Sequence, residues 1–389
     1  MNICSEAFLS IIFLCSGIIV IMEEKLILTT ESLSIEFKHP LFNNLIMFLG
    51  EMSALIIYYF FFQKEYENEK LLEENKDKIE IEKYKLIIPA IMDLLACFFG
   101  ILSLVLLPVS VDQMLNGSTT IIVFILSILC LKTKFNINNY IGIPITVIGL
   151  FIIGLSDYLN TKNDEGKKEE SRLNTIGGII LLLISDFFHS CQTITEEYFM
   201  KTKICHPLIC IGVEGIFGFF INLILFIGFS FIKCDNFNIT IKEKLCTVDN
   251  KNNYYIENFI FSFEQLINSS KLIIIFVTFY IILIILNCSY VSLTKVANAT
   301  TTVVVHNLTA FFVWIICLLP FMPKEILEKF QYLQAIGFAI LIIGTLLYNE
   351  IIDLKVKKKT INNDDNHLIK KEQENLDSKQ LFNDSNVEE

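Results

Sequence analysis

Basic side chains are almost missing from the apolar parts of this chain. Its 389 residues include 31 lysines and arginines, of which Arg172 is the only arginine, against 42 acidic residues. Apart from Lys271, at the edge of an apolar run, no lysine or arginine lies inside the long hydrophobic runs. Because no basic patch is interleaved with aromatic residues either, we expect no nucleic-acid partner.

Motifs of common hydrolases are missing as well. The chain has no His-Glu-x-x-His and no Gly-x-Ser-x-Gly sequence, and no cysteine and histidine stand at the spacing of a metal site. We therefore expect no catalytic residues, no metal, no cofactor and no enzymatic activity.

Hydrophobic sequence is what the chain has in excess. Hydrophobic residues make up 53% of it and the mean hydropathy is +0.56, which is unlike a soluble domain. Since about 20 apolar residues cross a bilayer as a helix, the sequence predicts an all-α polytopic membrane protein. The ten predicted spans are 3–22, 40–63, 86–107, 109–131, 137–157, 175–199, 207–232, 271–293, 297–320 and 331–352. The first could instead be a signal peptide, although it lacks a basic start.

Lysines in the connections predict the orientation. The short loops carry Lys132 and Lys134, then Lys201 and Lys203, and positive loops stay in the cytosol. Both termini and the charged loop 64–85 are then cytosolic, whereas loop 233–270 faces the other compartment. In that loop, Cys234 and Cys246 form either a disulfide or two free thiols.

Two stretches of the chain resemble each other. Residues 117–124 (GSTTIIVF) and 299–306 (ATTTVVVH) each precede a span that closes on a glycine, Gly154 or Gly344. The copies are five spans apart, so one is inverted relative to the other, as in many secondary carriers. We predict two inverted five-helix halves, 1–157 and 175–352, with a non-cytosolic linker 158–174 and a disordered cytosolic tail 353–389.

Several polar residues interrupt the apolar spans. On a helix at 100° per residue, Asp186, His189, Thr193 and Glu197 form one stripe. The residues expected to contact solute or carry protons are Glu51, Asp93, Gln113, Asn116, Asp186, His189, Thr193, Glu197, Glu214, Asn298, Thr301 and His306. Asp186 and His189, three residues apart, are either a proton relay or a clamp between helices.

These buried carboxyl groups lack cationic partners within the spans. Such groups either take up protons, because burial disfavours the charged form, or face a wet cavity that holds cations. Both outcomes fit a carrier of cationic or zwitterionic solutes. Neither fits a pyrophosphate-bearing solute, which would require lysine or arginine.

Five short motifs resemble one known family. HPLFNNLIMFLGE (39–51), PAIMDLLACFFGILSL (89–104), VSVDQMLNGSTTIIV (109–123), TEEYF (195–199) and GVEGIFG (212–218) resemble the drug/metabolite transporter superfamily, in its solute-carrier-35 F-type branch. The chain is also similar to chloroquine-resistance-type carriers. The resemblance implies ten helices in two inverted halves, with a central cavity between spans 1–4 and 6–9. The lysine-rich positions of classical nucleotide-sugar carriers are missing.

Three functions remain open. The first is a secondary transporter of a small metabolite, coupled to protons. The alternatives are an antiporter of nucleotide sugars or related anions, and a non-transporting membrane adaptor. Acidic di-leucine motifs at Leu71-Leu72 and Leu368-Ile369 predict sorting adaptors and a lysosomal or vacuolar membrane, with Golgi or endosome as alternatives. The solute and membrane lipid are the other expected partners, and the oligomeric state stays open.

Overall fold

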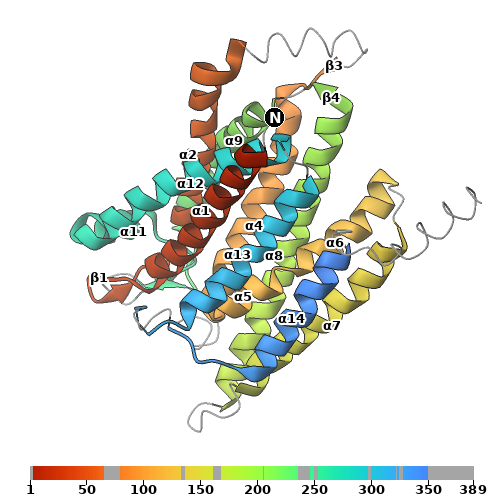
Figure 1. Cartoon of the computed structure of the whole chain (residues 1–389). Helices are drawn as coiled ribbons and strands as arrows, with labels where there is room; N and C mark the ends of the chain where they lie inside the picture. The colour runs from red at the N-terminus through yellow and green to blue at the C-terminus, as the bar shows by residue number, and fades with distance from the viewer. Residues whose placement is uncertain are drawn as a thin grey trace, which may run out of the picture.

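Helices dominate the computed structural model, which describes residues 3–64, 79–132, 136–160, 168–204, 206–234, 246–248, 253–296, 299–320, 322–323 and 327–348. The helices run side by side in one elongated bundle (Figure 1). The start of α1 and strands β3 and β4 lie at one end of the bundle, and strand β1 lies towards the other. We call these the β3–β4 end and the β1–β2 end.

The first half of the chain forms the helices predicted for spans 1 to 5. They are α1 (Ile3–Thr29), α2 (Pro40–Ile57) with a π-helical turn Tyr58–Phe62, a 3-10 turn Lys83–Leu86 leading into α4 (Ile87–Leu106), α5 (Val109–Leu115), α6 (Ser118–Leu126) with a π-helical turn Ser127–Leu131, and α7 (Ile137–Asn160). Prolines at the start of α2 and at the cap before α5 favour these helix starts, because a proline there loses no backbone hydrogen bond.

The second half follows the same order. Its helices are α8 (Lys168–Thr202), α9 (Pro207–Phe229), α11 (Phe259–Asn268), α12 (Ser270–Val296), α13 (Ala299–Cys317) and α14 (Tyr332–Tyr348). Helix α11 was not predicted. It begins where the Asn258 side chain accepts a hydrogen bond from the backbone N–H of Phe261, 3.0 Å away, which caps the helix.

Short strands join the helices at both ends of the bundle. Antiparallel β1 (Glu31–Ser32) and β2 (Ile35–Glu36) form a hairpin, β3 (Ile79–Glu80) and β4 (Lys203–Ile204) pair in parallel, and β5 (Thr247–Val248) and β6 (Tyr254–Tyr255) are antiparallel. Cys234 and Cys246, one of which directly precedes β5, form a disulfide with Cα atoms 6.6 Å apart.

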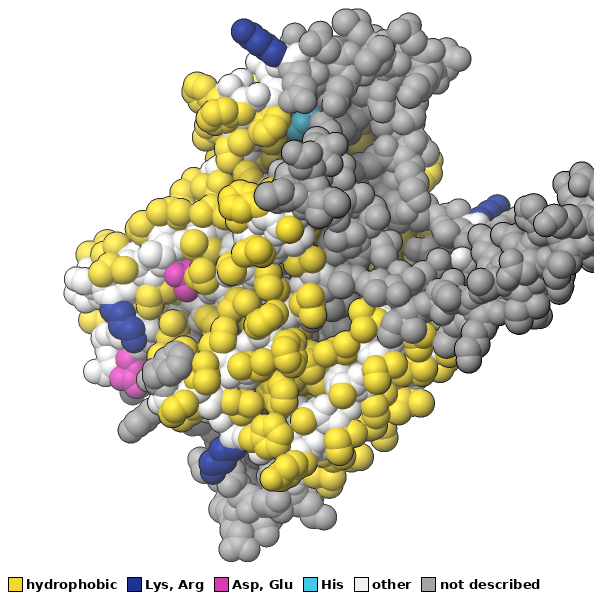
Figure 2. All heavy atoms as spheres, viewed as in Figure 1, with side chains coloured by type: hydrophobic (Ala, Val, Ile, Leu, Met, Phe, Trp, Pro, Cys, Tyr) yellow, Lys and Arg dark blue, Asp and Glu magenta, His cyan; other side chains and the backbone are white. Residues whose placement is uncertain are grey.

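The surface of the bundle is apolar. Seven of the described helical segments are long and apolar enough to cross a membrane, and large hydrophobic side chains such as Phe60, Phe151 and Ile224 are exposed. Hydrophobic side chains cover most of the described part of the face in Figure 2, with few charged ones. The coarse prediction of a polytopic helical membrane protein is therefore confirmed. The predicted spans 1, 9 and 10 match α1, α13 and α14, which are outside these seven, so ten crossings stay a prediction.

Helix α1 is longer than predicted. The predicted span ended at residue 22, before Glu23, Glu24 and Lys25, but the helix continues to Thr29. Lys25 is buried, and its Nζ donates hydrogen bonds to the carbonyl oxygens of Leu104 (2.5 Å) and Leu107 (3.2 Å). These carbonyls at the end of α4 lack partners within their own helix, so they can hold a cation inside the bundle.

The fourth predicted span is broken into two helices. Asn116 and Gly117 separate α5 from α6, and the backbone N–H of Thr119 bonds the Asn116 carbonyl at 3.1 Å. The Thr119 hydroxyl donates to the same carbonyl at 2.7 Å. A hydroxyl that competes for a backbone carbonyl loosens the α-helical ladder, which accounts for a break that hydropathy does not reveal.

Glycines bring two pairs of helices into backbone contact. A Cβ on Gly142 would lie 2.5 Å from the backbone N of Tyr348, and one on Gly344 would lie 2.5 Å from the backbone N of Thr146, so α7 and α14 touch. Helices α2 and α9 meet in the same way: a Cβ on Gly215 would lie 2.6 Å from the Met52 N. Both contacts exclude side chains larger than glycine.

Six other helix contacts form three matched pairs. Helix α4 packs on α8 and α1 on α12; α6 packs on α8 and α1 on α13; α4 packs on α9 and α2 on α12. Predicted spans 1 to 5 correspond in order to spans 6 to 10. When each span is replaced by its counterpart in the other half, one contact of each pair becomes the other contact of that pair. The α2–α9 and α7–α14 contacts turn into themselves.

Candidate functional site

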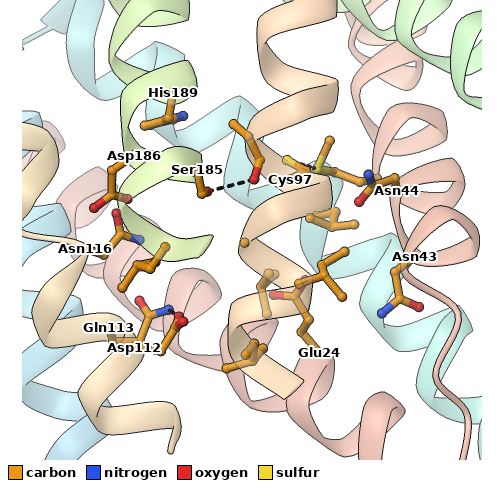
Figure 3. Close-up of a pocket in the computed structure, with 18 of the residues that line it drawn as sticks. Glu24, Asn43, Asn44, Cys97, Asp112, Gln113, Asn116, Ser185, Asp186 and His189 are labelled. Atoms are coloured by element: carbon orange, nitrogen blue, oxygen red, sulfur yellow. Dashed lines mark hydrogen bonds between the residues drawn. The ribbon is translucent and has the colours of Figure 1, made fainter. Parts of the chain in front are cut away.

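A cavity of about 230 Å³ lies inside the bundle. Its walls come from α1, α2, α4, α5, α8, α12 and α13, that is, from both halves of the chain. Figure 3 shows the polar part of this wall, with Asp186 and His189 on one side and Asn43 and Asn44 on the other. Of the described residues that line it, none is a lysine or an arginine.

Three acids line the cavity: Glu24, Asp112 and Asp186. Asp186 is 2% exposed, and one of its carboxylate oxygens accepts a hydrogen bond from the Ser118 hydroxyl at the start of α6. Asp112 accepts from the Ser103 hydroxyl at 2.7 Å. The helix break at residues 116–117 thus places a hydroxyl beside an acid of α8.

Two amides of α2 also line the cavity. Asn43 and Asn44 are 1% and 0% exposed, and the oxygen and nitrogen of both side chains have no hydrogen-bond partner within the structure. Burying an unpaired amide costs about 1–3 kcal/mol. A pair of such groups on a cavity wall is therefore well placed to bind a polar ligand.

Two histidines complete the polar wall. His189 of α8 and His306 of α13 line the cavity, and both rings are exposed to it. Phe13 of α1 lies against His306, with ring centroids 6.4 Å apart. Gln113 and Asn116 lie beside His306 in a smaller adjoining pocket. One residue of each repeat-related segment, Gly117 of 117–124 and His306 of 299–306, therefore lines the smaller pocket.

The structure divides the residues predicted from the sequence into two groups. Gln113, Asn116, Asp186, His189 and His306 line the cavity. Glu51, Asp93 and Glu214 do not line it. Thr193 does not either: its hydroxyl donates to the His189 carbonyl at 2.9 Å. Asn298 lies outside the described residues, and so do the side chains of Glu197 and Thr301.

Asp186 and His189 do not contact each other directly. Ser118 bonds the Asp186 carboxylate, whereas the His189 ring interacts with Gln192, one turn farther along α8. In Figure 3 the two side chains leave α8 at different heights. A proton relay through a direct Asp186–His189 bond is therefore not formed in this conformation.

Four other acids meet nearer the β3–β4 end. Glu51 of α2 interacts with Asp93 of α4, and Glu196 of α8 interacts with Glu214 of α9. Gln192 reaches both Asp93 and Glu196. We call Glu51, Asp93, Glu196 and Glu214 the carboxyl cluster. Glu51, Asp93 and Glu214 were predicted to belong to one site with Asp186, but they do not line the cavity, and Glu196 was not predicted as a site residue.

At the β1–β2 end, Glu328, an acid outside the predicted spans, contacts the start of α5. The Glu328 carboxylate accepts hydrogen bonds from the backbone N–H (3.0 Å) and the hydroxyl of Ser110, and that hydroxyl accepts one from Gln334 at 2.8 Å. Burial raises the pKa of Glu328, while the bonds from Ser110 oppose this shift. These contacts tie the loop before α14 to α5.

Sequence reasoning missed Glu24, Asn43, Asn44 and Cys97. Glu24 was placed in a loop because the first span was ended too early. The adjacent asparagines lie in the motif HPLFNNLIMFLGE. Two amide side chains within an apolar helix indicate a polar site, so the sequence did contain a signal for them. No group of three or more histidines, cysteines or acids among the described residues could hold a metal ion.

Comparison with known proteins gives a consistent answer. The profile of solute carrier family 35, F branch, matches residues 7–246. "Solute carrier family 35 member F6" of Rattus norvegicus is 28% identical over 313 residues, covering 80% of this chain and 78% of that protein; the Homo sapiens protein of the same name is 26% identical over 317 residues, with the same coverage. An uncharacterised protein of Schizosaccharomyces pombe is 27% identical over 312 residues, covering 79% of this chain and 85% of its own length.

A similar fold occurs in a solved structure. One crystal structure of a protein superposes with a TM-score of 0.51 at 10% identity. The superposition covers 91% of this chain and 100% of the other. At this identity the likeness concerns the fold alone.

Proposed function

The chain belongs to solute carrier family 35, and from that premise we propose that it is a proton-coupled secondary transporter of a small cationic or zwitterionic metabolite. The observation that carries this proposal is the cavity. Its described lining has three carboxyl groups, two unpaired amides and no lysine or arginine. A cation is attracted by such a wall, and the amides are free to bind its polar groups.

The matched helix contacts support alternating access. Contacts that exchange when the two halves are exchanged are expected of an inverted repeat. In such carriers one part rocks against the other around a central site, and this cavity has walls from both halves. We therefore propose ten spans in two inverted halves, divided as the sequence predicts.

The second candidate, a nucleotide-sugar antiporter, has one point in its favour, the family itself. Phosphate recognition uses arginine, lysine or helix N-termini, and the described cavity wall offers acids instead. The third candidate, a non-transporting adaptor, leaves the unpaired amides of the cavity without a purpose.

Uptake by reconstituted vesicles tests the proposal. Purified full-length protein is placed in lipid vesicles with labelled choline, a labelled neutral amino acid or a labelled nucleotide sugar outside, at two internal pH values. We expect protein-dependent uptake of the cation or the zwitterion that increases with the pH gradient. Uptake or exchange of only the nucleotide sugar would reject the first proposal in favour of the second. The adaptor would be favoured if a wider panel of cations and zwitterions also gave no uptake.

For the location, we propose an acidic endomembrane with both termini in the cytosol. The disulfide between Cys234 and Cys246 supports a non-cytosolic β1–β2 end, because disulfides persist outside the cytosol. The two di-leucine motifs lie outside the described residues. Replacing Leu71 and Leu72 by alanine in a fluorescently tagged chain should shift it from lysosomes or vacuoles to the cell surface. An unchanged distribution, also after replacement of Leu368 and Ile369, would reject these motifs as sorting signals.

A further inference from the structure

The carboxyl cluster is set apart from the cavity along the helices. Glu196 lies near the end of α8 and Glu214 near the start of α9, both towards the β3–β4 end of the bundle. On α8, the cavity residues Asp186 and His189 come two to three turns earlier. None of the four cluster acids lines the cavity.

Close helix packing forces the acids together. A Cβ on Gly215 would lie 2.6 Å from the Met52 N and 2.8 Å from the Glu51 Cβ. Glycine at this position lets α9 approach α2 until Glu214, its neighbour, is near Glu51. Electrostatic interaction links Glu214 to Glu51, Asp93 and Glu196.

No cation balances the cluster among the described side chains. The groups that face it are Glu51 from α2, Asp93 and Cys97 from α4, Gln192 and Glu196 from α8, Glu214 from α9 and Tyr290 from α12. All are neutral or acidic. Four carboxyl groups that interact electrostatically are not all ionised at once, because their repulsion is strong where little water screens it.

The cluster has unused hydrogen-bonding capacity. Asp93 and Glu214 are 6% and 3% exposed, and the Asp93 Oδ2, Glu214 Oε1 and Gln192 Oε1 atoms are buried without a hydrogen-bond partner. Free carboxylate oxygens in a cluster without cations are suited to accept protons. The described acids do not assemble into a metal site, which favours the proton over a metal ion as ligand.

We propose that the carboxyl cluster is the coupling-proton site and that it is separate from the solute cavity. A proton enters from water at the β3–β4 end and binds one carboxylate oxygen, without change to any other bond. Cys97 connects the two regions, since it lines the cavity and its thiol lies 3.6 Å from Asp93 Oδ1. The role of the site in transport depends on the function proposed above, but its ability to bind protons does not.

Separate sites have a kinetic consequence. If proton and solute bound the same carboxylate, protons would compete with solute, and excess solute would overcome their effect. With two sites, pH changes the maximal rate of transport while solute affinity stays nearly constant. The two arrangements therefore differ in whether pH acts on Vmax or on KM.

Proton binding is tested first without any solute. Infrared difference spectra of the purified full-length protein between acidic and alkaline pH report the C=O stretch of protonated carboxyl groups. We expect a band from buried acids that Glu214→Gln and Glu196→Gln each reduce and shift. The control Glu31→Gln, an exposed acid of β1, should leave the buried band unchanged. An unaltered band in both cluster variants would overturn the proposal, whether or not transport is found.

Transport gives the second test, with labelled choline or a neutral amino acid as the probe. A gradient of one pH unit drives up to about tenfold accumulation per coupled proton, because it corresponds to about 1.4 kcal/mol. Glu214→Gln should abolish this accumulation but leave solute exchange without a gradient within about twofold. Accumulation that persists in Glu214→Gln and in Glu51→Gln would overturn the proposal. If the unmodified protein transports neither these probes nor the wider panel of cations and zwitterions while the infrared result holds, the proposed function fails and the proton site stands.

Discussion

The bundle contains two groups of buried acids, and they differ in what surrounds them. In the cavity, Asp186 and Asp112 accept hydrogen bonds from serines and face open space. In the carboxyl cluster, Asp93 and Glu214 face other acids, beside the close contact of α2 and α9 at Gly215. A carboxyl group beside open space is thus suited to bind a solute, and one that faces other acids is suited to bind a proton.

The largest expected effect is on the cavity. Asp186→Asn removes a carboxyl group from its wall, and losing a hydrogen bond to a charged solute group, worth about 1.5–3 kcal/mol, should weaken solute binding about 10- to 100-fold. Ser118→Ala keeps the carboxyl group and should cost less. The measurement is KM for uptake of choline or a neutral amino acid. An unchanged KM in Asp186→Asn would remove this acid from the binding site.

The second effect concerns the packing that creates the cluster. Gly215→Ala places a methyl group against Met52 and Glu51, and such overpacking costs about 1–3 kcal/mol. Thermal unfolding should occur at lower temperature, and the pH response of uptake should decrease more than solute affinity. Gly228→Ala on the same helix, with nothing within 4 Å of its Cβ, is the matched control. A greater loss of solute affinity than of pH response would contradict the separation of the two regions.

The third effect should have opposite signs for stability and function. Asn44→Leu replaces an unpaired buried amide by an apolar group of similar size, so we expect stability to rise by about 1 kcal/mol while solute uptake decreases. Asn222→Leu removes an amide that donates to the Leu41 carbonyl at 2.8 Å and should destabilise the protein. Unfolding temperatures and uptake rates of both variants test this, and a destabilised Asn44→Leu would show that the amide is already satisfied.

The smallest effect lies outside both regions, at Glu328. Burial raises the pKa of this carboxyl above its ordinary 4.5, so the folded protein binds its proton more tightly than the unfolded chain does. The stability that this proton contributes is complete below about pH 4.5 and is lost as pH rises through the raised pKa of the folded protein. Glu328→Gln should therefore have a flatter profile of unfolding temperature against pH, and a profile parallel to that of the unmodified protein would refute this.

Much of this arrangement could be predicted from the sequence, because long apolar runs leave little choice but helices. Gln113, Asn116, Asp186 and His306 were expected near solute on residue type and repeat position alone, and they line the cavity. What hydropathy cannot supply is where a helix ends among charged residues. Glu24 was lost for that reason, since α1 buries Lys25 against the carbonyls of α4.

The division into two regions could not be predicted either. The acids of spans 2, 3 and 7 looked equivalent to Asp186, because a sequence gives the order of residues along each helix but not the rotation of one helix against another. That rotation depends on contacts such as Gly215 against Met52. The motif GVEGIFG contained the signal, since glycines on both sides of an acid indicate close approach of another helix.

One helix links the two regions mechanically. Helix α8 has 35 residues and is about 50 Å long at 1.5 Å per residue, against a hydrocarbon layer of about 30 Å. It holds Asp186 and His189 in the cavity and Glu196 in the cluster, and its end pairs through β4 with β3, in the loop predicted to be cytosolic. A continuous helix behaves as a stiff rod, so any tilt displaces all three side chains together. The end of α8 would then be displaced during each transport cycle. A fluorescent label on the β3–β4 pair could follow this displacement.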